Sequence, residues 1–563
     1  MAFFCLNSTT NYDLEAQEIE TFPTQSESLS ERAASSYWQG QYQDAIAIWE
    51  NLLKSASSEE AATIHRYLGV AYRQVGQLGR AIESLKQASQ FYEQSHDETS
   101  RARLAEVLVE RARTHNEMGQ SSRSVSLLEQ AIELIEGSKL VQLQTSAYQA
   151  LGTAYLLGGD FDRAIEAYER SRNLAAVLEQ PEELVSTLNN LTNALLQRQA
   201  RYRSDAEAAA AEGNETEAQR LSFLAERDDE AALNAVSRAI KESQGMENPS
   251  AVRARLNMAE LSPETDYRWQ ARAILNRLPP SHEKANLLLN LAQTQTENES
   301  IALLEEAANM ASSTGDWRTE SFALGKLGYI YEKSGNYGQA LQYTQQAQWA
   351  AQQVMAADSL YRWQWQAGRI YQATSQVEPA KSAYRGALAT LQKLRGEIAS
   401  ASPEFQIDVR EEVEPVYREF LGLLLNEDSD RPEELKEAIE IRNQLQLSEL
   451  QSFFGDACLE LKQALVDARN VLPDRTARIH SIILEDSLYT VLELPNREFH
   501  SYRVNLQASE LTEEIERWRM QLVSSSIPLS YRGLSERLYD WLIRPMESDL
   551  TEIDTLIFVN DGL

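Results

Sequence analysis

The residues best suited to nucleophilic chemistry are few and widely spaced in this chain of 563 residues. It has only two cysteines, Cys5 and Cys458, and six histidines. A cysteine nucleophile needs a histidine within hydrogen-bond reach to remove its proton. Cys458 stands in FFGDACLELKQ, which is typical of an apolar helix, where a cysteine is usually a small buried hydrophobe. His480 and His500 come later, in a run of predicted strands, so we expect no Cys–His dyad and no catalytic residue.

Metal and phosphate chemistry are not predicted either. The stretch NEDSDRPEELKE has acidic residues at calcium-loop spacing, but Arg431 stands where such a loop requires glycine, and Pro432 follows. The sequence contains no glycine-rich phosphate loop and no His-Glu-x-x-His motif. A zinc site needs clustered ligands, whereas the four remaining histidines fall singly in different parts of the chain: His65, His96, His115 and His282. We therefore expect no cofactor.

A third set of polar residues suits the recognition of a polypeptide. Three asparagines stand two residues before a small residue that recurs along the chain, and Lys326 and Gln366 occupy the same place further on. An asparagine amide can donate to and accept from an extended peptide backbone at once, and an arginine can meet acidic side chains. A single exposed asparagine is usually only solvated, and that alternative remains open. The predicted binding residues are Asn190, Asn193, Asn257, Asn290, Lys326 and Arg369.

The elements that carry these residues follow from a repeated pattern of small and large side chains. Two helices approach closely only where a side chain is small, and a large neighbour fills the adjoining gap. A small residue, an aromatic residue three positions on and a second small residue twelve positions on predict a tetratricopeptide-type helix pair. Four segments fit the pattern: Gly69, Tyr72 and Ala81; Gly152, Tyr155 and Ala164; Gly328, Tyr331 and Ala340; and Gly368, Tyr371 and Ala380.

Weaker copies extend the array to about nine units. Thr192 marks a further first helix whose partner is displaced by an Ala- and Glu-rich insertion near residues 198–230. Alanine and glutamate favour helices, so the insertion predicts an elongated helical hairpin, either a contact arm or a solvated spacer. The remaining pairs of small or apolar residues, again twelve positions apart, are Ala33 with Ala45, Ala112 with Ser124, Ala259 with Ala271, and Ala292 with Leu304.

From Arg475 the periodicity changes. Three short β-branched and aromatic runs predict a meander, two amphipathic helices follow, and residues 555–559 (TLIFV) predict a strand of the kind that is buried on both faces. These elements alone leave a sheet edge uncovered. Either the molecule is truncated, or another chain completes the sheet.

The array, the connector ending in LSELQSFFGDACLE, the IILED meander with Leu-Pro-Asn, and the closing LIFVNDGL together resemble bacterial, notably cyanobacterial, TPR-CHAT proteins. The resemblance implies a caspase-like CHAT domain that stops here before its catalytic His and Cys. It also implies that a full-length relative would be a cysteine endopeptidase with protein partners.

The charge limits the class of partner. Lysine and arginine number 53 against 85 aspartates and glutamates, a net charge of −32, which disfavours nucleic acid and anionic membranes. Two distant cysteines and an N-terminus without a basic signal region favour a cytoplasmic protein. The expected domains are a disordered tail (1–28), the solenoid (29–395), a helical connector or cap (396–470) and the first part of a CHAT domain (471–563).

We therefore expect a mainly α chain, a tetratricopeptide solenoid followed by a partial α/β segment, that serves as a scaffold binding a protein or peptide in its groove. One alternative is the regulatory or substrate-recognition part of a CHAT cysteine peptidase. Another is a purely structural role, in which the solenoid joins subunits of an assembly.

Overall fold

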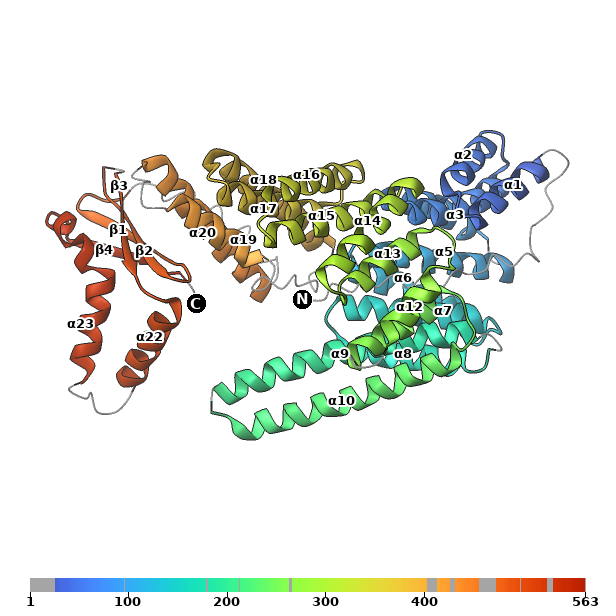
Figure 1. Cartoon of the computed structure of the whole chain (residues 1–563), viewed down its shortest axis with the longest axis horizontal. Helices are drawn as coiled ribbons and strands as arrows, with labels where there is room; N and C mark the ends of the chain where they lie inside the picture. The colour runs from blue at the N-terminus through green and yellow to red at the C-terminus, as the bar shows by residue number, and fades with distance from the viewer. Residues whose placement is uncertain are drawn as a thin grey trace. The chain divides into compact units, whose positions relative to one another are not determined.

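The computed structural model in Figure 1 describes residues 26–95, 97–178, 181–211, 213–262, 266–401, 413–425, 431–454, 472–496, 498–523 and 530–561. Residues 1–25 of the predicted tail, Cys458, His96 and the calcium-like stretch 426–430 lie outside these ranges. The chain forms two compact units, residues 1–370 with 392–405, and residues 371–391 with 406–563.

The first unit is a stack of antiparallel helix pairs. In each pair an odd-numbered helix, here called the first helix, packs against the even-numbered second helix that follows, and α3 to α15 also contact the next first helix. The helices are α1 (Ser26–Trp38), α2 (Tyr42–Leu53), α3 (Ser58–Gln74), α4 (Leu78–Tyr92), α5 (Glu98–Glu117), α6 (Ser121–Ile135), α7 (Val141–Leu157), α8 (Phe161–Ala175), α9 (Pro181–Ala211), α10 (Glu215–Glu242), α11 (Pro249–Leu261), α12 (Tyr267–Leu275), α13 (His282–Ala292), α14 (Glu297–Thr314), α15 (Trp317–Lys333), α16 (Tyr337–Gln353) and α17 (Ala357–Ala373).

Small residues stand where the helices of a pair touch. A Cβ atom added to Gly152 would lie 2.7 Å from the ring of Tyr168 on α8, and one added to Gly328 would lie 2.6 Å from Thr344 Oγ1 on α16. The small residues predicted on the facing helices are fully buried, including Ala45, Ala81, Ala164, Ala271 and Ala340. The predicted fold class, a tetratricopeptide-like helical solenoid followed by a small sheet, is confirmed.

The stack closes on itself after about seven pairs. A Cβ atom on Gly40, in the α1–α2 turn, would lie 3.2 Å from the carbonyl oxygen of Pro280 before α13. A Cβ atom on Gly315, which ends α14, would lie 3.0 Å from Gln43 Nε2 on α2. The first helix pair therefore rests on the loops that flank the seventh.

The second pair makes the same kind of contact. A Cβ atom on Gly76, in the α3–α4 turn, would lie 3.6 Å from Asp316 Oδ1 and 3.7 Å from Arg318 Cβ, both at the start of α15. Gly76 has a φ of 71°, so only glycine adopts this turn without strain. We call the contacts of residues 40, 43 and 76 with residues 280 and 315–318 the seam.

Helices α9 and α10 extend past their neighbours as a long hairpin (Figure 1). Beyond residue 200 the hairpin has a small apolar cluster of its own, built from Ala206, Ala209 and Leu221 with Tyr202 and Ala218 packed against them. We call residues 198–229 the arm. Its cluster is separate from those of the stack, so the arm is held only by its own contacts and by its root.

The second unit begins in the last turn of α17 and includes the N-terminal part of α18 (Val377–Ala401), which packs with α19 (Glu414–Leu424) and α20 (Pro432–Phe454). Tyr384 of α18 stacks on Phe420 of α19 with ring centroids 5.5 Å apart. Lys381 Nζ of α18 lies 2.8 Å from Glu434 Oε1 of α20.

A four-stranded sheet of order β3-β2-β1-β4 follows. Strand β1 pairs antiparallel with β2 and parallel with β4, and β3 pairs antiparallel with β2. The elements are β1 (Thr476–Ile483), β2 (Ser487–Glu493), β3 (Phe499–Asn505), α22 (Ala508–Val523), α23 (Ser530–Leu542), the 3-10 helix η3 (Arg544–Leu550) and β4 (Thr555–Val559).

Strand β4 differs from the expectation that it is buried on both faces. It is an edge strand, with Ile557 38% exposed and Phe558 50% exposed. The apolar run predicted a strand correctly, but burial of both faces requires layers that cover them, and β4 stands at the edge of the sheet with β1 as its one neighbouring strand. No helix in the described ranges combines the length and apolarity needed to span a bilayer.

Candidate functional site

The candidate site is one face of the first helices. On α9, Ser186, Asn190, Asn193 and Gln197 follow one another at intervals of four, three and four residues, which places them on one side of the helix. The opposite side packs into the core through apolar residues such as Leu188 and Leu195. We call these four positions the stripe. The same positions exist on the other first helices, counted from the small residue that touches the second helix.

Several stripe residues are buried although they face away from their own second helix. Asn190 is 7% exposed, Asn257 on α11 is 5%, and Arg113 on α5 is 3%. Side chains on this face can be covered only by other parts of the stack, because the second helix lies on the other side. The first helices therefore crowd around a shared, polar interior.

Asn190 and Asn193 are the predicted residues that best fit a binding role. The Nδ2 of Asn190 and the Oδ1 of Asn193 are both buried, and neither has a hydrogen-bond partner among the described residues. A buried amide group without a partner costs about 1–3 kcal/mol. The two groups therefore need a partner beyond the described residues, such as water or a ligand, and they present one donor and one acceptor a single helical turn apart.

Asn257 is already used within the stack. Its Nδ2 donates to the backbone oxygen of Asn189 at 3.3 Å, and Asn189 Nδ2 in turn donates to the backbone oxygen of Ser250 at 2.9 Å. These two bonds join α9 to α11. Asn290 stands half-buried at the matching place on α13.

Lys326 and Arg369 stand on the stripes of α15 and α17, apart from the α9 pair. Arg369 donates to both carboxylate oxygens of Glu332 at 2.7 and 2.9 Å, and its guanidinium carbon lies 4.6 Å from the ring centroid of Trp365. Lys326 is half-buried, and Lys333 Nζ lies 5.4 Å from the ring centroid of Tyr329. The structure thus separates the predicted residues into an amide group on α9, α11 and α13 and a cationic group on α15 and α17.

A chain of polar contacts that the repeat pattern did not predict joins successive first helices. Arg73 of α3 lies 3.2 Å from Glu110 and 2.8 Å from Glu117 of α5, and Arg113 lies 2.8 Å from Glu110. Further on, Gln149 of α7 donates to Thr187 of α9 at 2.5 Å. Glu110 and Arg113 occupy the stripe positions of α5, so a charged pair at stripe spacing is a signal that was present in the sequence.

His282 belongs to this chain of contacts and lies beside the seam. Its Nδ1 bonds the carboxylate of Asp316, the N-cap of α15, and its Nε2 lies 3.0 Å from the amide of Asn286. Burial by itself would lower the pKa of His282, but the Asp316 carboxylate, helped by Glu117 and Glu283, raises it above its usual value. The imidazole in turn holds the pKa of Asp316 below its usual value against the effect of burial.

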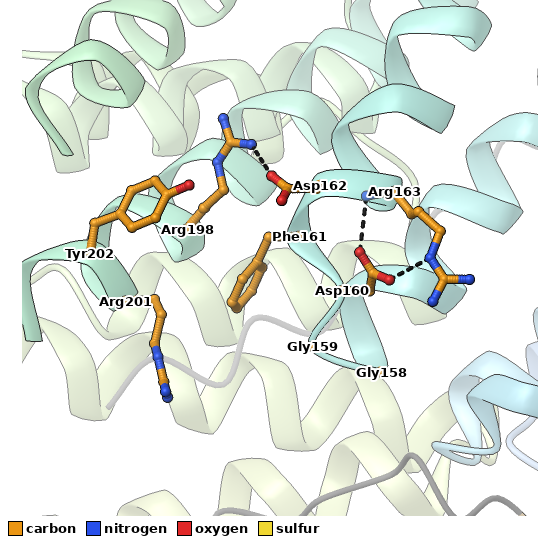
Figure 2. A pocket seen from close by; sticks show the side chains of 9 residues that line it. All are labelled: Gly158, Gly159, Asp160, Phe161, Asp162, Arg163, Arg198, Arg201 and Tyr202. Atoms are coloured by element: carbon orange, nitrogen blue, oxygen red, sulfur yellow. Dashed lines mark hydrogen bonds and ion pairs between the residues drawn. The ribbon is translucent and has the colours of Figure 1, made fainter. Parts of the chain in front are cut away.

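An open hollow of about 400 Å³ lies at the root of the arm, between the α7–α8 turn and α9. Phe161 and Tyr202 line it, and Figure 2 shows Arg198 reaching from α9 to Asp162. Arg198 also donates to both oxygens of Asp228 on α10 at 2.7 and 2.8 Å. The guanidinium is thereby held between carboxylates on two other helices, so this wall braces the point where the arm leaves the stack.

The described residues form no metal constellation. Across those residues, no group of three or more His, Cys, Asp or Glu side chains could hold a metal ion. His480 is buried in β1 and lies 3.5 Å from Glu493, and His500 of β3 bonds Asp549.

Part of the chain matches a known repeat family. Residues 145–175, which include most of α7 and all of α8, match the tetratricopeptide repeat. No curated protein matches the chain.

Several solved solenoid structures are similar at low identity. The apo form of RapI is 11% identical, with 58% of this chain and 98% of that one covered and a TM-score of 0.35. A Rap protein complexed with competence and sporulation factor is 14% identical, with 73% and 100% covered and a TM-score of 0.35. Yeast Tom70 is 11% identical, with 78% and 94% covered and a TM-score of 0.26.

Proposed function

We propose that the chain is a protein-interaction scaffold that binds an extended polypeptide along the stripes of its first helices. The observation that carries this proposal is the unpaired donor of Asn190 beside the unpaired acceptor of Asn193. Polar groups inside a folded protein almost always have a partner. Two unpaired amides of opposite hydrogen-bond character on one face therefore point to an external partner that supplies both an acceptor and a donor.

A polypeptide backbone is such a partner. The two asparagines are separated by about 4.5 Å along the helix axis, at 1.5 Å per residue. An extended chain rises about 3.3 Å per residue, so its neighbouring N–H and C=O groups fall within the reach of both amides. The cationic stripes of α15 and α17, with Lys326 and Arg369, would meet acidic side chains of the same ligand, and Asn257 and Asn290 would border it.

The test begins with a peptide selected from a random library on the purified chain. We expect the double variant N190A/N193A to bind that peptide about thirtyfold more weakly, because two hydrogen bonds worth about 1 kcal/mol each are lost. The matched control is N173A/N234A, which removes two exposed asparagines from the second helices α8 and α10. Equal affinity of wild type and N190A/N193A would exclude the α9 stripe as the binding face.

For the C-terminal unit we infer a CHAT-type segment over residues 471–563, in which β4 offers a place for a further strand. In the parallel register Ile557 lies opposite Arg478 and Phe558 opposite Ile479, so the two exposed side chains point to opposite faces. An apolar edge strand with both faces partly open is a typical docking site for another strand. The incoming strand would come from another chain or from a continuation of this one.

This inference leaves a second candidate function, the regulatory or substrate-recognition part of a CHAT cysteine peptidase in a cytoplasmic, bacterial setting. It is favoured by the exposed edge of β4, whereas catalysis by the present residues is not proposed. Reading the gene in frame beyond the codon for Leu563 tests it. A strand followed by His and another followed by Cys would support the peptidase, and a stop codon would leave the scaffold with a partner strand from another chain.

A further inference from the structure

The interior in which Asn190 and Asn193 lie is closed in this structure. The Nδ2 of Asn190 and the Oδ1 of Asn193 are both buried, and the same holds for stripe residues of α5 and α11. A polypeptide cannot reach these groups while the stack keeps its present form. Binding on this face therefore requires that the stack open somewhere.

Most of the stack resists opening because adjacent helix pairs share apolar clusters. One cluster runs from Ala62 of α3 to Ala167 of α8, and another from Ala251 of α11 to Trp363 of α17. Separating neighbours within either cluster would expose apolar surface at about 25 cal/mol per Å². The interfaces between successive pairs are thus the strong contacts of the first unit.

The seam has a different character. The cluster of α1 to α4 contains residues 33–81, and that of α11 to α17 contains residues 251–363, and no apolar cluster of the described residues spans the two. The seam is made by turns and helix ends, with Gly40 against the Pro280 carbonyl, Gln43 against Gly315, and Gly76 against Asp316. None of these contacts joins two apolar side chains, so parting them costs less than separating pairs that share an apolar cluster, and the seam belongs to the segments that open most readily.

We propose that the seam is the gate of the binding face: the first two helix pairs move off the seventh and eighth to admit a polypeptide, and they return to enclose it. This inference rests on the proposed function for its ligand, but the opening itself can be measured without one. A ligand that binds only the open form draws the population toward that form, and its apparent affinity falls by the fraction of molecules that are open. Any bond that holds the seam shut must then weaken binding.

A disulfide engineered across the seam would be such a bond. The Cβ atoms at positions 76 and 318 would lie 3.7 Å apart, which is within the range of a disulfide. We would make G76C/R318C in a C5S/C458S background, so that no other thiol competes. The reduced form of the same protein, together with G76C and R318C alone, controls for the backbone strain of a side chain at position 76 and for the loss of Arg318.

The first readout is the rate at which a maleimide modifies a cysteine placed at Asn190. We expect oxidised N190C/G76C/R318C to react at least tenfold more slowly than N190C in the same background with the seam unbridged. A cysteine at Asn173, exposed on α8, should react equally fast in both. Equal rates at position 190, or failure of the disulfide to form under mild oxidation, would overturn the gate.

The second readout is the affinity for the selected peptide. The oxidised double-cysteine chain should bind it at least tenfold more weakly than wild type, and reductant should restore the affinity. If the oxidised chain binds like wild type, the gate is wrong and the proposed function stands. If N190A/N193A binds like wild type, the proposed function is wrong, whatever the labelling rates show about the seam.

Discussion

Asn190 is in a position that favours binding over stability. Its amide nitrogen is buried and has no partner among the described residues, and a buried polar group without a partner costs free energy that an apolar residue would not cost. The same holds for the side-chain oxygen of Asn193, which is also buried and has no partner among the described residues. Side-chain atoms that the described fold does not satisfy can bond a ligand, whereas the amide of Asn257 is already bonded inside the fold.

We therefore expect N190A to leave the free energy of unfolding unchanged or to raise it by about 1 kcal/mol, while it weakens peptide binding. Denaturant unfolding followed by circular dichroism measures the first effect, and titration with the selected peptide measures the second. N257A is the contrast, because it removes a bond to the Asn189 carbonyl and should lower the stability by about 1 kcal/mol. A loss of stability in N190A as large as that in N257A would contradict the assignment.

His282 gives the seam region a dependence on pH. The folded-state pKa of the imidazole is raised above its usual 6.5 by Asp316. A raised pKa means that the ion pair contributes its full stability below the unfolded pKa and loses it as the pH rises through the folded pKa. The pKa of Asp316 is lowered from its usual 3.8, so the stability that its carboxylate contributes is lost only at strongly acidic pH.

The wild-type chain should therefore exceed H282Q in stability at pH 6, by roughly 1–2 kcal/mol, and the difference should shrink at pH 9. Thermal unfolding of both proteins across this range provides the comparison. A difference that stays constant with pH would mean that the imidazole is held by shape and hydrogen bonding alone.

At the scale of the element, the spacing of small residues determines which helices pair. Gly328 and Gly338 separate this steric effect from ordinary helix propensity. A Cβ atom on Gly328 would collide with Gln366 and Thr344, whereas one on Gly338 of α16 meets nothing within 4 Å. Alanine is favoured over glycine inside a helix by about 1 kcal/mol when nothing opposes it.

G338A should consequently be neutral or slightly stabilising, and G328A should destabilise the chain by about 1–3 kcal/mol through overpacking. The midpoint of urea unfolding measures both. Equal midpoints for the two variants would show that the twelve-residue pattern does not reflect close helix contact.

The arm is an element whose stability is local. L221A removes the largest aliphatic residue of the arm cluster, in which Leu221 is 7% exposed. We expect a local loss of about 2–3 kcal/mol, seen as faster amide exchange over residues 202–221 with no change in the stack. F223A, which truncates a residue 65% exposed on the same helix, should leave exchange unchanged. Faster exchange throughout the stack in L221A would mean that the arm supports the solenoid.

These elements show which features the sequence could predict. The helix pairs follow from sterics between residues twelve positions apart, so Gly152 with Ala164 and Gly328 with Ala340 were enough to place them. The seam was not predictable, because it depends on small rotations accumulated over seven pairs and has no local signal at Gly40 or Gly76. The asparagines fall between these cases, since a stripe amide can bond a neighbouring helix, as Asn257 does, or face the interior unpaired, as Asn190 does.

At the scale of the whole molecule, each of the two units has a feature that fits the binding of another polypeptide. In the first unit the feature is the polar interior that contains the unpaired amide atoms of Asn190 and Asn193. The seam closes this interior, and no apolar cluster of the described residues spans the seam. In the second unit the feature is the open edge of β4. Just after this strand, Arg418 bonds Asp561 and Arg442 bonds the Asn560 carbonyl, and these bonds steady it. The scaffold proposed above would account for both features.

The most direct test of the central claim is to locate a bound peptide. A crystal structure of the chain with the selected peptide should show an extended backbone on the stripe of α9, with Asn190 Nδ2 donating to a peptide carbonyl and Asn193 Oδ1 accepting from a peptide N–H. The residues of the seam should also be displaced or re-formed around the peptide. A peptide bound to the second helices or to the arm, with the two asparagine amides still unpaired, would contradict the account.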